Sequence, residues 1–357
     1  MILRRQSLLA ALWLASAVST CAAAVPGVAV PDAAASAPAT ASAPAAAADV
    51  RCPPEASTPT PDEAAAGMRE AVDSGLLWKA TKAGRVVYLY GTIHVAKLSW
   101  AYPGPDVMRA LRASDVVALE LDLTDPGVLE RLRRAIERRP GAPALPEALQ
   151  RRLAAGMVAN CVPPERLAGL RPEMQAVTVD LMTARQFGLY PEYGIDMVVA
   201  GVAHTLGKPI RSLETPESQA SLLVSDDPVE TARTVGEVLD ELDGGNGPRM
   251  LQRLAGDWQR GDLADLGAYG QWCECLETAR QRADFERLIA QRNPLMADRI
   301  VQWHAEGRSL FVAVGSLHMT GPGGLPRLLQ ARGFQVERVA FPPAGEPDAR
   351  TRVGSST

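Results

Sequence analysis

Two of the four histidines lie in the same short setting, which is suited to binding a metal ion. His94 and His318 each end a G-x-x-H motif, and each motif directly follows an apolar stretch. Neutral imidazole is the commonest metal ligand among side chains. By contrast, His204 and His304 lie inside helical patterns, so we expect both of them at the surface and partly solvated.

Two carboxylates complete this set of chemically capable side chains. Glu120 and Glu214 each end an apolar run, as the two histidines do. Two imidazoles with one or two carboxylates are suitable ligands for Zn²⁺, Mn²⁺ or Co²⁺, with open positions left for water. The sequence therefore predicts a divalent metal ion held by His94, Glu120 and His318.

Each of these residues also has a purely structural interpretation. A histidine at a strand end can bond to a loop carbonyl, and Glu120 can pair with an arginine or a backbone N–H. Glu214 precedes Thr215, which can cap a helix. Asp196 is a candidate N-cap as well, and capping explains it as well as a catalytic role does.

The elements that must position these residues are short apolar strands separated by helical segments. A strand, a helix and a second strand follow one another from Arg85 to Glu120, which is the order of a βαβ unit and implies a parallel sheet. Ligands bind beyond the carboxyl ends of parallel strands, so residues far apart in the chain are expected to meet there. The expected strands are 85–90, 116–120, 209–214, 309–314 and an edge strand at 335–340.

The remaining segments have helical patterns. Residues 125–185 are interrupted by several prolines, so we expect a series of short helices there. A helix over 197–206 and a mostly helical stretch over 216–307, with a loop at 243–248, complete the plan. The order His, Glu, Glu, His along the strands suggests two pseudo-related halves that meet face to face.

The N-terminus predicts export. Arg4 and Arg5 precede an apolar run that ends in small residues near Ala24, which is typical of a cleaved secretory signal rather than a membrane span. Cys21 offers an alternative, because a lipid attached there would tether the protein to a membrane. We expect a signal peptide at 1–24, a disordered Ala/Pro-rich leader at 25–65, a single domain at 66–342 and a disordered tail at 343–357.

Charge and cysteine content narrow the partners and the compartment. Removal of Arg4 and Arg5 takes the formal net charge from −4 to about −6, which disfavours nucleic acid as a partner. No segment beyond the signal is apolar enough to span a membrane. The four remaining cysteines predict one or two disulfides in an oxidising periplasm or cell envelope, with the close pair Cys273 and Cys275 more easily joined to distant partners than to each other.

Six motifs, taken in order, resemble the TraB/GumN family. The resemblance covers roughly residues 75–342. The motifs are Y-L-Y-G-T-I-H-V from Tyr88, A-L-E-L-D from Ala118, Y-G-I-D from Tyr193, G-K-P-I-R-S-L-E-T-P-E-S-Q from Gly207, R-N from Arg292 and F-V-A-V-G-S-L-H-M-T-G-P-G-G-L from Phe311.

This resemblance implies a fold and a set of functional residues. The fold would be similar to the erythromycin esterase/ChaN-like group, an α/β fold with a mixed, largely parallel β-sheet wrapped by helices. It also implies kinship with the TIKI proteins, metal-dependent proteases whose activity is attributed to paired G-x-x-H motifs and an acidic residue. Carried over to this chain, the candidate catalytic residues are His94, Glu120, Glu214, Arg292 and His318.

The leading hypothesis is a metal-dependent, peptidase-like hydrolase of the bacterial cell envelope. A bound ion would activate water, and a second carboxylate, Glu214 or Glu120, would act as general base on a peptide or a small-molecule ester. Serine hydrolysis is disfavoured, because Ser316 lacks the flanking G-x-S-x-G pattern. The alternatives are a non-catalytic periplasmic protein that binds a peptide or haem and has a regulatory role, and a structural protein without a site.

Overall fold

One six-stranded mixed sheet runs through the molecule in the order β4-β3-β5-β2-β1-β6. The computed structural model of the chain describes residues 51–341. The four strands predicted to end at functional residues are all present, as is the predicted edge strand. The strands are β1 (Leu76–Lys82), β2 (Arg85–Thr92), β3 (Val116–Leu119), β4 (Ile210–Ser212), β5 (Leu310–Gly315) and β6 (Gln335–Val339).

The centre of the sheet is parallel, as the βαβ order predicts. Strand β5 lies between β3 and β2 and pairs with both in parallel, with Thr92 opposite Gly315. Strand β3 also pairs in parallel with β4, with Leu119 opposite Ser212. All four carboxyl ends therefore lie along one edge of the sheet, which is where the candidate functional residues follow.

The antiparallel part of the sheet includes a strand that the sequence reasoning did not predict. Strand β1 forms a hairpin with β2, and β6 adds to its other side, also antiparallel. The hairpin loop is Ala83-Gly84, and both residues have positive φ, 50° and 75°. Alanine rarely adopts this conformation, so the loop lacks the Asn-Gly or Asp-Gly signal by which such hairpins are recognised.

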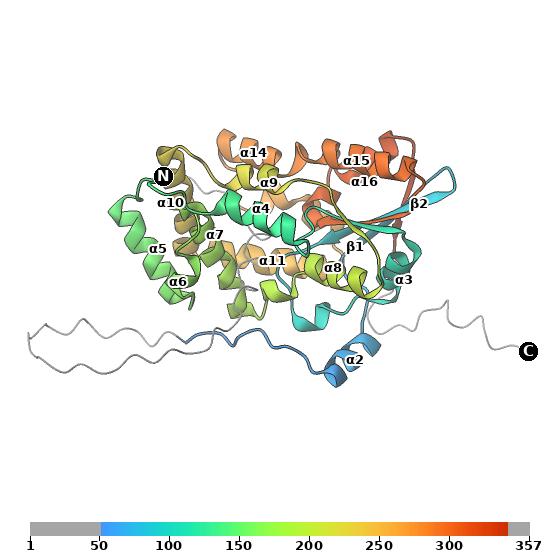
Figure 1. The fold of residues 1–357 in the computed structure, drawn as a ribbon, viewed down its shortest axis with the longest axis horizontal. Coiled ribbons are helices and arrows are strands. Elements are labelled where there is room, and N and C mark those ends of the chain that lie inside the picture. Colours follow the sequence, from blue (N-terminus) through green and yellow to red (C-terminus); the bar gives the residue numbers. More distant parts are fainter. Residues whose placement is uncertain (1–50, 342–357) are drawn as a thin grey trace, which may run out of the picture.

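Helices cover both faces of the sheet, and several of them gather at one end of the molecule (Figure 1). The prolines of the 125–185 segment divide it into four helices, as predicted. The longer helices are α2 (Pro61–Arg69), α3 (Pro105–Ala113), α4 (Pro126–Ile136), α5 (Glu147–Ala159), α7 (Pro172–Met182), α8 (Ile195–Thr205), α9 (Pro216–Leu223), α10 (Pro228–Gly244), α11 (Asn246–Arg260), α14 (Ala279–Phe285), α15 (Asn293–Ala305) and α16 (Leu325–Ala331). The short ones are η1 (Leu98–Trp100), α6 (Pro164–Leu167), η2 (Thr183–Phe187), η3 (Pro191–Tyr193), α12 (Leu263–Gly267), α13 (Tyr269–Trp272), η4 (Glu286–Ala290) and η5 (Ser316–Met319).

Two details of the helical region correct the sequence interpretation. The loop expected at 243–248 is a single residue, Gly245, whose φ of 64° lets α10 end and α11 begin at once. His304 is buried, not solvated: it is 4% exposed and packs edge-on against Phe334, with ring centroids 4.9 Å apart. His204 is exposed, as expected.

The hydrophobic core has two parts, one on each face of the sheet. Alternate residues of β5 point to opposite sides, so Phe311 and Ala313 belong to one cluster while Leu310, Val312 and Val314 belong to the other. This alternation follows from the two-residue period of a strand. Because both faces are buried, β5 is apolar throughout and forms a rigid support for the residues that follow it.

The end of the predicted leader is attached to the domain. Cys52 forms a disulfide with Cys161, the residue after the C-cap of α5. The Tyr190 hydroxyl donates a hydrogen bond to the Pro54 carbonyl, and the Tyr193 hydroxyl donates one to the Ser57 carbonyl. Contacts with the body of the domain therefore begin upstream of residue 66, the predicted start of the domain. The predicted signal peptide, Cys21 and the tail after residue 342 lie outside the described residues.

We expect the Cys52→Ser/Cys161→Ser variant to unfold more easily, by about 2–4 kcal/mol, because the disulfide closes a loop between residues 109 positions apart. Urea unfolding of the oxidised protein measures this difference, and limited proteolysis should show new cleavage near residues 51–60. Removing Cys273 and Cys275 instead, which are two positions apart, should have a smaller effect. An unchanged urea midpoint would contradict the prediction.

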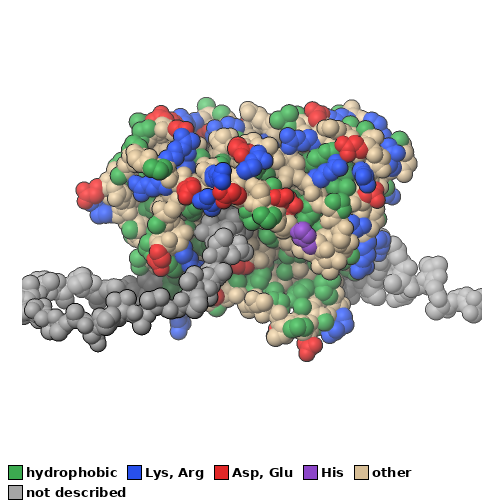
Figure 2. Space-filling view, viewed as in Figure 1, with side chains coloured by type: hydrophobic (Ala, Val, Ile, Leu, Met, Phe, Trp, Pro, Cys, Tyr) green, Lys and Arg blue, Asp and Glu red, His purple; other side chains and the backbone are tan. Residues whose placement is uncertain are grey.

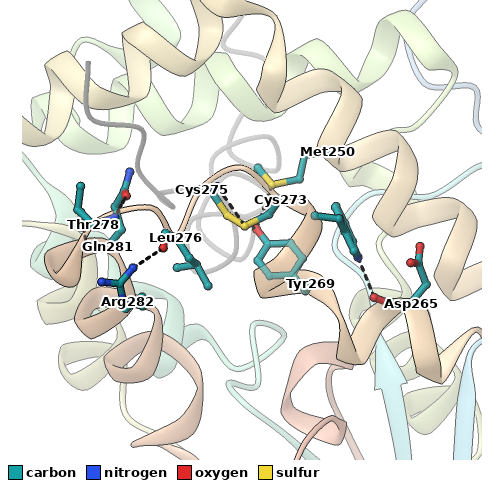
Figure 3. The surroundings of a disulfide bond; sticks show 10 residues. Met250, Asp265, Tyr269, Cys273, Cys275, Leu276, Thr278, Gln281 and Arg282 are labelled. Carbon is teal, nitrogen blue, oxygen red and sulfur yellow. Dashed lines mark hydrogen bonds between the residues drawn. A yellow bond between two sulfur atoms is a disulfide. The ribbon is translucent and has the colours of Figure 1, made fainter. Parts of the chain in front are cut away.

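The second disulfide joins Cys273 to Cys275, which corrects the expectation that these cysteines pair with distant partners (Figure 3). The residue between them, Glu274, has a φ of 52°, and this left-handed turn brings the two side chains together. Both cysteines are buried, and the Tyr269 hydroxyl lies 3.0 Å from the Met250 sulfur beside them. The pair therefore closes a tight turn between α13 and α14.

The surface carries both signs of charge. On the face shown in Figure 2, acidic and basic side chains are interspersed. Ion pairs between helices include Arg131 with Glu217 and Arg152 with Asp240. Within residues 51–341, no helix has the length and apolar character that crossing a membrane requires.

Candidate active site

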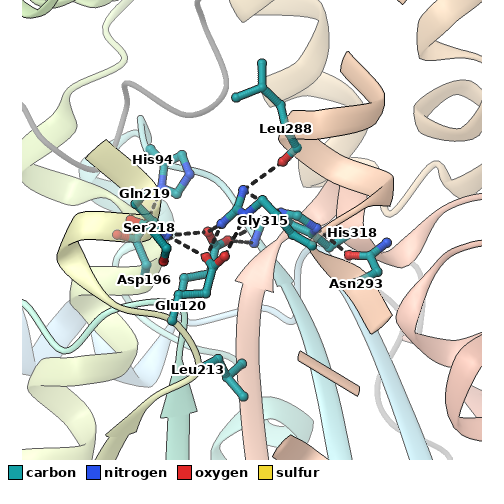
Figure 4. A network of polar contacts seen from close by, with 12 residues as sticks. His94, Glu120, Asp196, Leu213, Ser218, Gln219, Leu288, Asn293, Gly315 and His318 are labelled. Atoms are coloured by element: carbon teal, nitrogen blue, oxygen red, sulfur yellow. Dashed lines mark hydrogen bonds and ion pairs between the residues drawn. The ribbon is translucent and has the colours of Figure 1, made fainter. Parts of the chain in front are cut away.

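Side chains from three strand ends meet in one space beside Gly315 (Figure 4). A β-carbon placed on Gly315 would lie 3.5 Å from Glu120 Oε1, 3.6 Å from His318 Cδ2 and 4.0 Å from His94 Nε2. His94, Glu120 and His318 therefore border the same small volume, although the two histidines are more than 200 positions apart in the chain. The structure brings together the residues that the sequence selected.

His94 is oriented by a buried carboxylate. Its Nδ1 lies 3.0 Å from Asp196 Oδ1, and both residues are buried, with exposures of 6% and 3%. Asp196 lies in the first turn of α8, whose N-cap is Gly194. It is therefore not the cap of this helix, and its carboxylate contacts the imidazole. This arrangement leaves His94 Nε2 turned toward the shared space.

His318 is held from both sides in its neutral form. Asn293 donates a hydrogen bond through Nδ2 to the Gly323 carbonyl, so its Oδ1 accepts the proton of His318 Nδ1 at 2.6 Å. His318 Nε2 then carries the lone pair and accepts a hydrogen bond from Arg292 Nη1 at 3.2 Å. Burial and the charge of Arg292 lower the pKa of His318 to about 3, so the ring is neutral near pH 7.

The two glutamates lie next to each other because the strand pairing continues past the strand ends. The Glu214 N–H donates to the Glu120 carbonyl at 3.0 Å, extending the β3–β4 ladder. One Glu120 oxygen accepts the Gly315 N–H at 2.8 Å. The Gln219 amide donates to both carboxylates, at 3.1 Å to Glu120 and 2.8 Å to Glu214.

Arg292 neutralises this pair of carboxylates. Its Nε donates to Glu214 at 2.9 Å, its Nη2 donates to both Glu214 and Glu120, and its Nη1 donates to the Leu288 carbonyl and to His318. Each of its donor nitrogens is thus engaged, and the residue is only 9% exposed. Arg292 follows the η4 turn and immediately precedes α15, which also supplies Asn293.

These charges set the ionisation of Glu120. Burial on its own would raise the pKa of the Glu120 carboxyl, but the nearby positive charge of Arg292 and the Gly315 hydrogen bond lower it to about 2. For Arg292, burial favours the neutral form, yet the two carboxylates raise its pKa above the ordinary value. The site therefore contains a permanently charged cluster beside a neutral imidazole.

The shared space opens into a cavity of about 50 Å³. Its polar side includes Thr92, His94, Glu120, Arg292 and His318. The Thr92 hydroxyl is buried and makes no hydrogen bond within the described residues, although its carbonyl accepts one from Ser316 Oγ at 2.8 Å. A free buried hydroxyl in such a place is available to a bound molecule.

The predicted metal ligands fit an ion by type but not in their present arrangement. His94 and His318 have partners on Nδ1, as metal-bound histidines usually do, and Glu120 is ionised. Arg292, however, occupies the lone pair of His318 Nε2 and one oxygen of Glu120. Across residues 51–341, no three or more His, Cys, Asp or Glu side chains are grouped so that they could hold a metal ion.

Three residues of this site were missed or left open by the sequence reasoning. Asn293 and Gln219 had no assigned role, and Asp196 was read equally well as a cap. Asn293 directly follows Arg292, and Gln219 lies five positions after Glu214. The available signal was therefore that each lies close in sequence to a candidate catalytic residue. Their partners lie on other elements, which a local pattern does not reveal.

Comparison with known proteins identifies the family to which this chain belongs. The uncharacterized protein YbaP of Escherichia coli strain K12 is 25% identical over 261 residues, covering 69% of this chain and 88% of YbaP. Metalloprotease TIKI1 of Danio rerio is 24% identical over 322 residues, covering 73% of this chain and 62% of TIKI1. No solved structure matches the chain. The model of the TraB/PrgY/gumN family matches residues 76–338, and this chain belongs to that family.

Proposed function

We propose that this chain is a hydrolase of the cell envelope that cleaves a peptide or a small ester, with His94 as the general base. The observation that carries the proposal is the Asp196–His94 pair, whose Nε2 lies on the side of the cavity beside Gly315. A carboxylate on Nδ1 fixes the tautomer that leaves Nε2 able to take a proton, and it stabilises the imidazolium that forms. A relative named a metalloprotease is consistent with hydrolysis.

The reaction needs only groups that border the cavity. His94 Nε2 removes a proton from water, the resulting hydroxide attacks the substrate carbonyl, and the carbon–nitrogen or carbon–oxygen bond breaks as His94 returns the proton to the leaving group. The free hydroxyl of Thr92 is the candidate donor to the negatively charged oxygen of the intermediate.

We assign the carboxylates a different role from the one that the sequence predicted. Glu120 and Glu214 are bound by Arg292 and Gln219. The Glu120 carboxyl, with a pKa of about 2, is also a weak base. We therefore assign them, with Arg292, to holding His318 and the Gly315 strand end in place. His318 supplies the second imidazole wall of the cavity.

The metal-dependent form of this proposal makes a separate demand on the site. A divalent ion bound by His94, His318 and Glu120 would acidify a bound water. Arg292 would first have to release His318 and Glu120. Elemental analysis of the purified mature protein tests this form: one equivalent of metal that is lost in His318→Ala supports it, and full hydrolysis without metal in a chelator overturns it.

The non-catalytic alternatives differ in what they require of the cavity. A cavity of about 50 Å³ is smaller than the roughly 150 Å³ that holds a benzene ring, so it is far too small for a porphyrin, which disfavours haem. A regulatory peptide binder would bind a library peptide without cleaving it. A peptide and ester library incubated with the mature protein, with products followed by mass spectrometry, separates binding from hydrolysis.

Replacing Gly315 with alanine should reduce hydrolysis at least about 10²-fold while leaving the fold intact. The backbone angles at Gly315 (φ −48°, ψ 138°) suit alanine, and the added methyl makes only ordinary contacts, yet it fills the space between the two imidazoles. Gly201→Ala is the matched control, because Gly201 is exposed on α8 and a β-carbon there meets nothing within 4 Å. Kinetics and thermal melting of both variants measure the effect, and a fully active Gly315→Ala protein would refute the location of the site.

A further inference from the structure

One side of the catalytic cavity is aliphatic. Five apolar residues from three elements line it, and each is less than 9% exposed. Three of them are spaced three and one positions apart on α11, so they lie on one face of that helix. The five residues, which we call the aliphatic wall, are Leu251, Leu254, Ala255, Leu266 and Ile289.

The aliphatic wall faces the same space as His94 Nε2 and Thr92. Water in that half of the cavity finds no polar side chain among the five wall residues, whereas an apolar group there is removed from solvent and gains close contacts. When the carbonyl of a substrate lies at His94, the group bonded to that carbonyl can therefore reach an apolar recess. Pockets of this kind, apolar with a few placed polar groups, are typical of small-molecule sites.

The size of the cavity limits what can enter. The cavity volume of about 50 Å³ is well below the roughly 150 Å³ of an apolar cavity that holds a benzene ring, so it favours a small aliphatic group over an aromatic one. A branched aliphatic side chain or a short acyl chain meets this limit. A phenyl ring, which is rigid and has six carbons, exceeds it.

We propose that the aliphatic wall selects substrates with a short aliphatic group next to the scissile carbonyl, and that Ala255 and Leu254 determine its depth. This inference rests on the proposed hydrolase function and names the substrate class of that same site. Both residues line the cavity from one face of α11, so a larger side chain at position 255 should shorten the recess and a smaller one at position 254 should lengthen it.

The experiment uses p-nitrophenyl esters with acetyl, butyryl, isovaleryl, octanoyl and benzoyl groups, and the purified mature chain. We expect butyryl and isovaleryl esters to react with a kcat/KM at least about tenfold above that of the acetyl and benzoyl esters. In Ala255→Leu the preference should move to the acetyl ester, and in Leu254→Ala the benzoyl and octanoyl esters should gain. Leu223→Ala, a similarly buried leucine on α9 away from the cavity, should keep the wild-type order.

A binding measurement separates this inference from the function on which it rests. Isovaleramide and benzamide, which lack a good leaving group, are titrated against each variant by ligand-observed NMR. If isovaleramide binds saturably and Ala255→Leu abolishes this binding, the apolar recess is supported. The same binding without cleavage of any ester overturns only the proposed hydrolase function. Cleavage with no dependence on chain length, unchanged in both wall variants, overturns the recess and leaves the hydrolase standing. Absence of both binding and cleavage overturns both.

Discussion

The His94→Ala variant is expected to lose hydrolysis by about 10²–10⁴-fold in kcat/KM, which is the contribution of a positioned general base. The substitution removes the imidazole whose Nδ1 contacts Asp196 and whose Nε2 faces the cavity. Substrate contacts made by the aliphatic wall remain, so kcat should fall far more than KM rises. Steady-state kinetics on the best substrate from the library measures both constants.

Two companion variants make this result specific. Asp196→Asn should also reduce kcat, because an amide no longer stabilises the imidazolium, and the rings should stay in place since Asn matches Asp in size. His204→Ala is the control histidine, because His204 is exposed and contacts Thr124 rather than the cavity. If the His94→Ala protein kept its full activity and its circular dichroism spectrum showed a folded protein, the assignment of His94 as base would be wrong.

Replacing Arg292 with methionine is expected to lower the free energy of unfolding by about 3–5 kcal/mol at pH 7, since it leaves the buried carboxylate of Glu120 and the partly buried one of Glu214 without their cation. Glu120 is 2% exposed and Glu214 lies beside it. An exposed pair should matter far less, so Arg131→Met, which loses only the surface bond to Glu217, should cost less than about 1 kcal/mol. Urea unfolding of both variants gives the comparison.

The pH dependence of this difference has a definite sign. The folded-state pKa of Glu120 is about 2, below its ordinary 4.5, so the stability it contributes is present above pH 4.5 and is lost as the pH falls toward 2. The gap between wild type and Arg292→Met should therefore narrow below pH 4.5. Adding Glu120→Gln and Glu214→Gln to Arg292→Met should restore part of the stability at pH 7, and failure of this rescue would show that the loss has another cause.

The strand ends could be predicted from sequence because their signal is local. An apolar run that ends in G-x-x-H or in glutamate gives both the element and the residue at its carboxyl end, and the parallel order then brings His94, Glu120, Glu214 and His318 to one edge. The same reasoning missed β1, whose turn at Ala83-Gly84 has unusual backbone angles for alanine. Local pattern reveals strands well where the turn residues are typical and poorly where they are not.

The partners of the site residues required the folded chain. Arg292 lies 26 positions from His318 and 172 from Glu120, so nothing in its neighbourhood indicates that it contacts these two predicted metal ligands. The pairing of Cys273 with Cys275 likewise depends on the left-handed conformation of Glu274. Long-range charge pairing and unusual φ values are tertiary properties, which explains why the sequence reasoning did not find these pairings although it located most of the strands.

The two outer strands of the sheet bear on how the protein behaves at high concentration. Unpaired strand borders invite another chain to add to them and start aggregates. Here one border, β4, is only three residues long, and the other, β6, displays Gln335, Glu337 and Arg338. A strand of a neighbouring molecule could therefore pair with only a few backbone groups at β4, and at β6 it would meet charged side chains. The sheet thus resists self-association although it is not closed into a barrel.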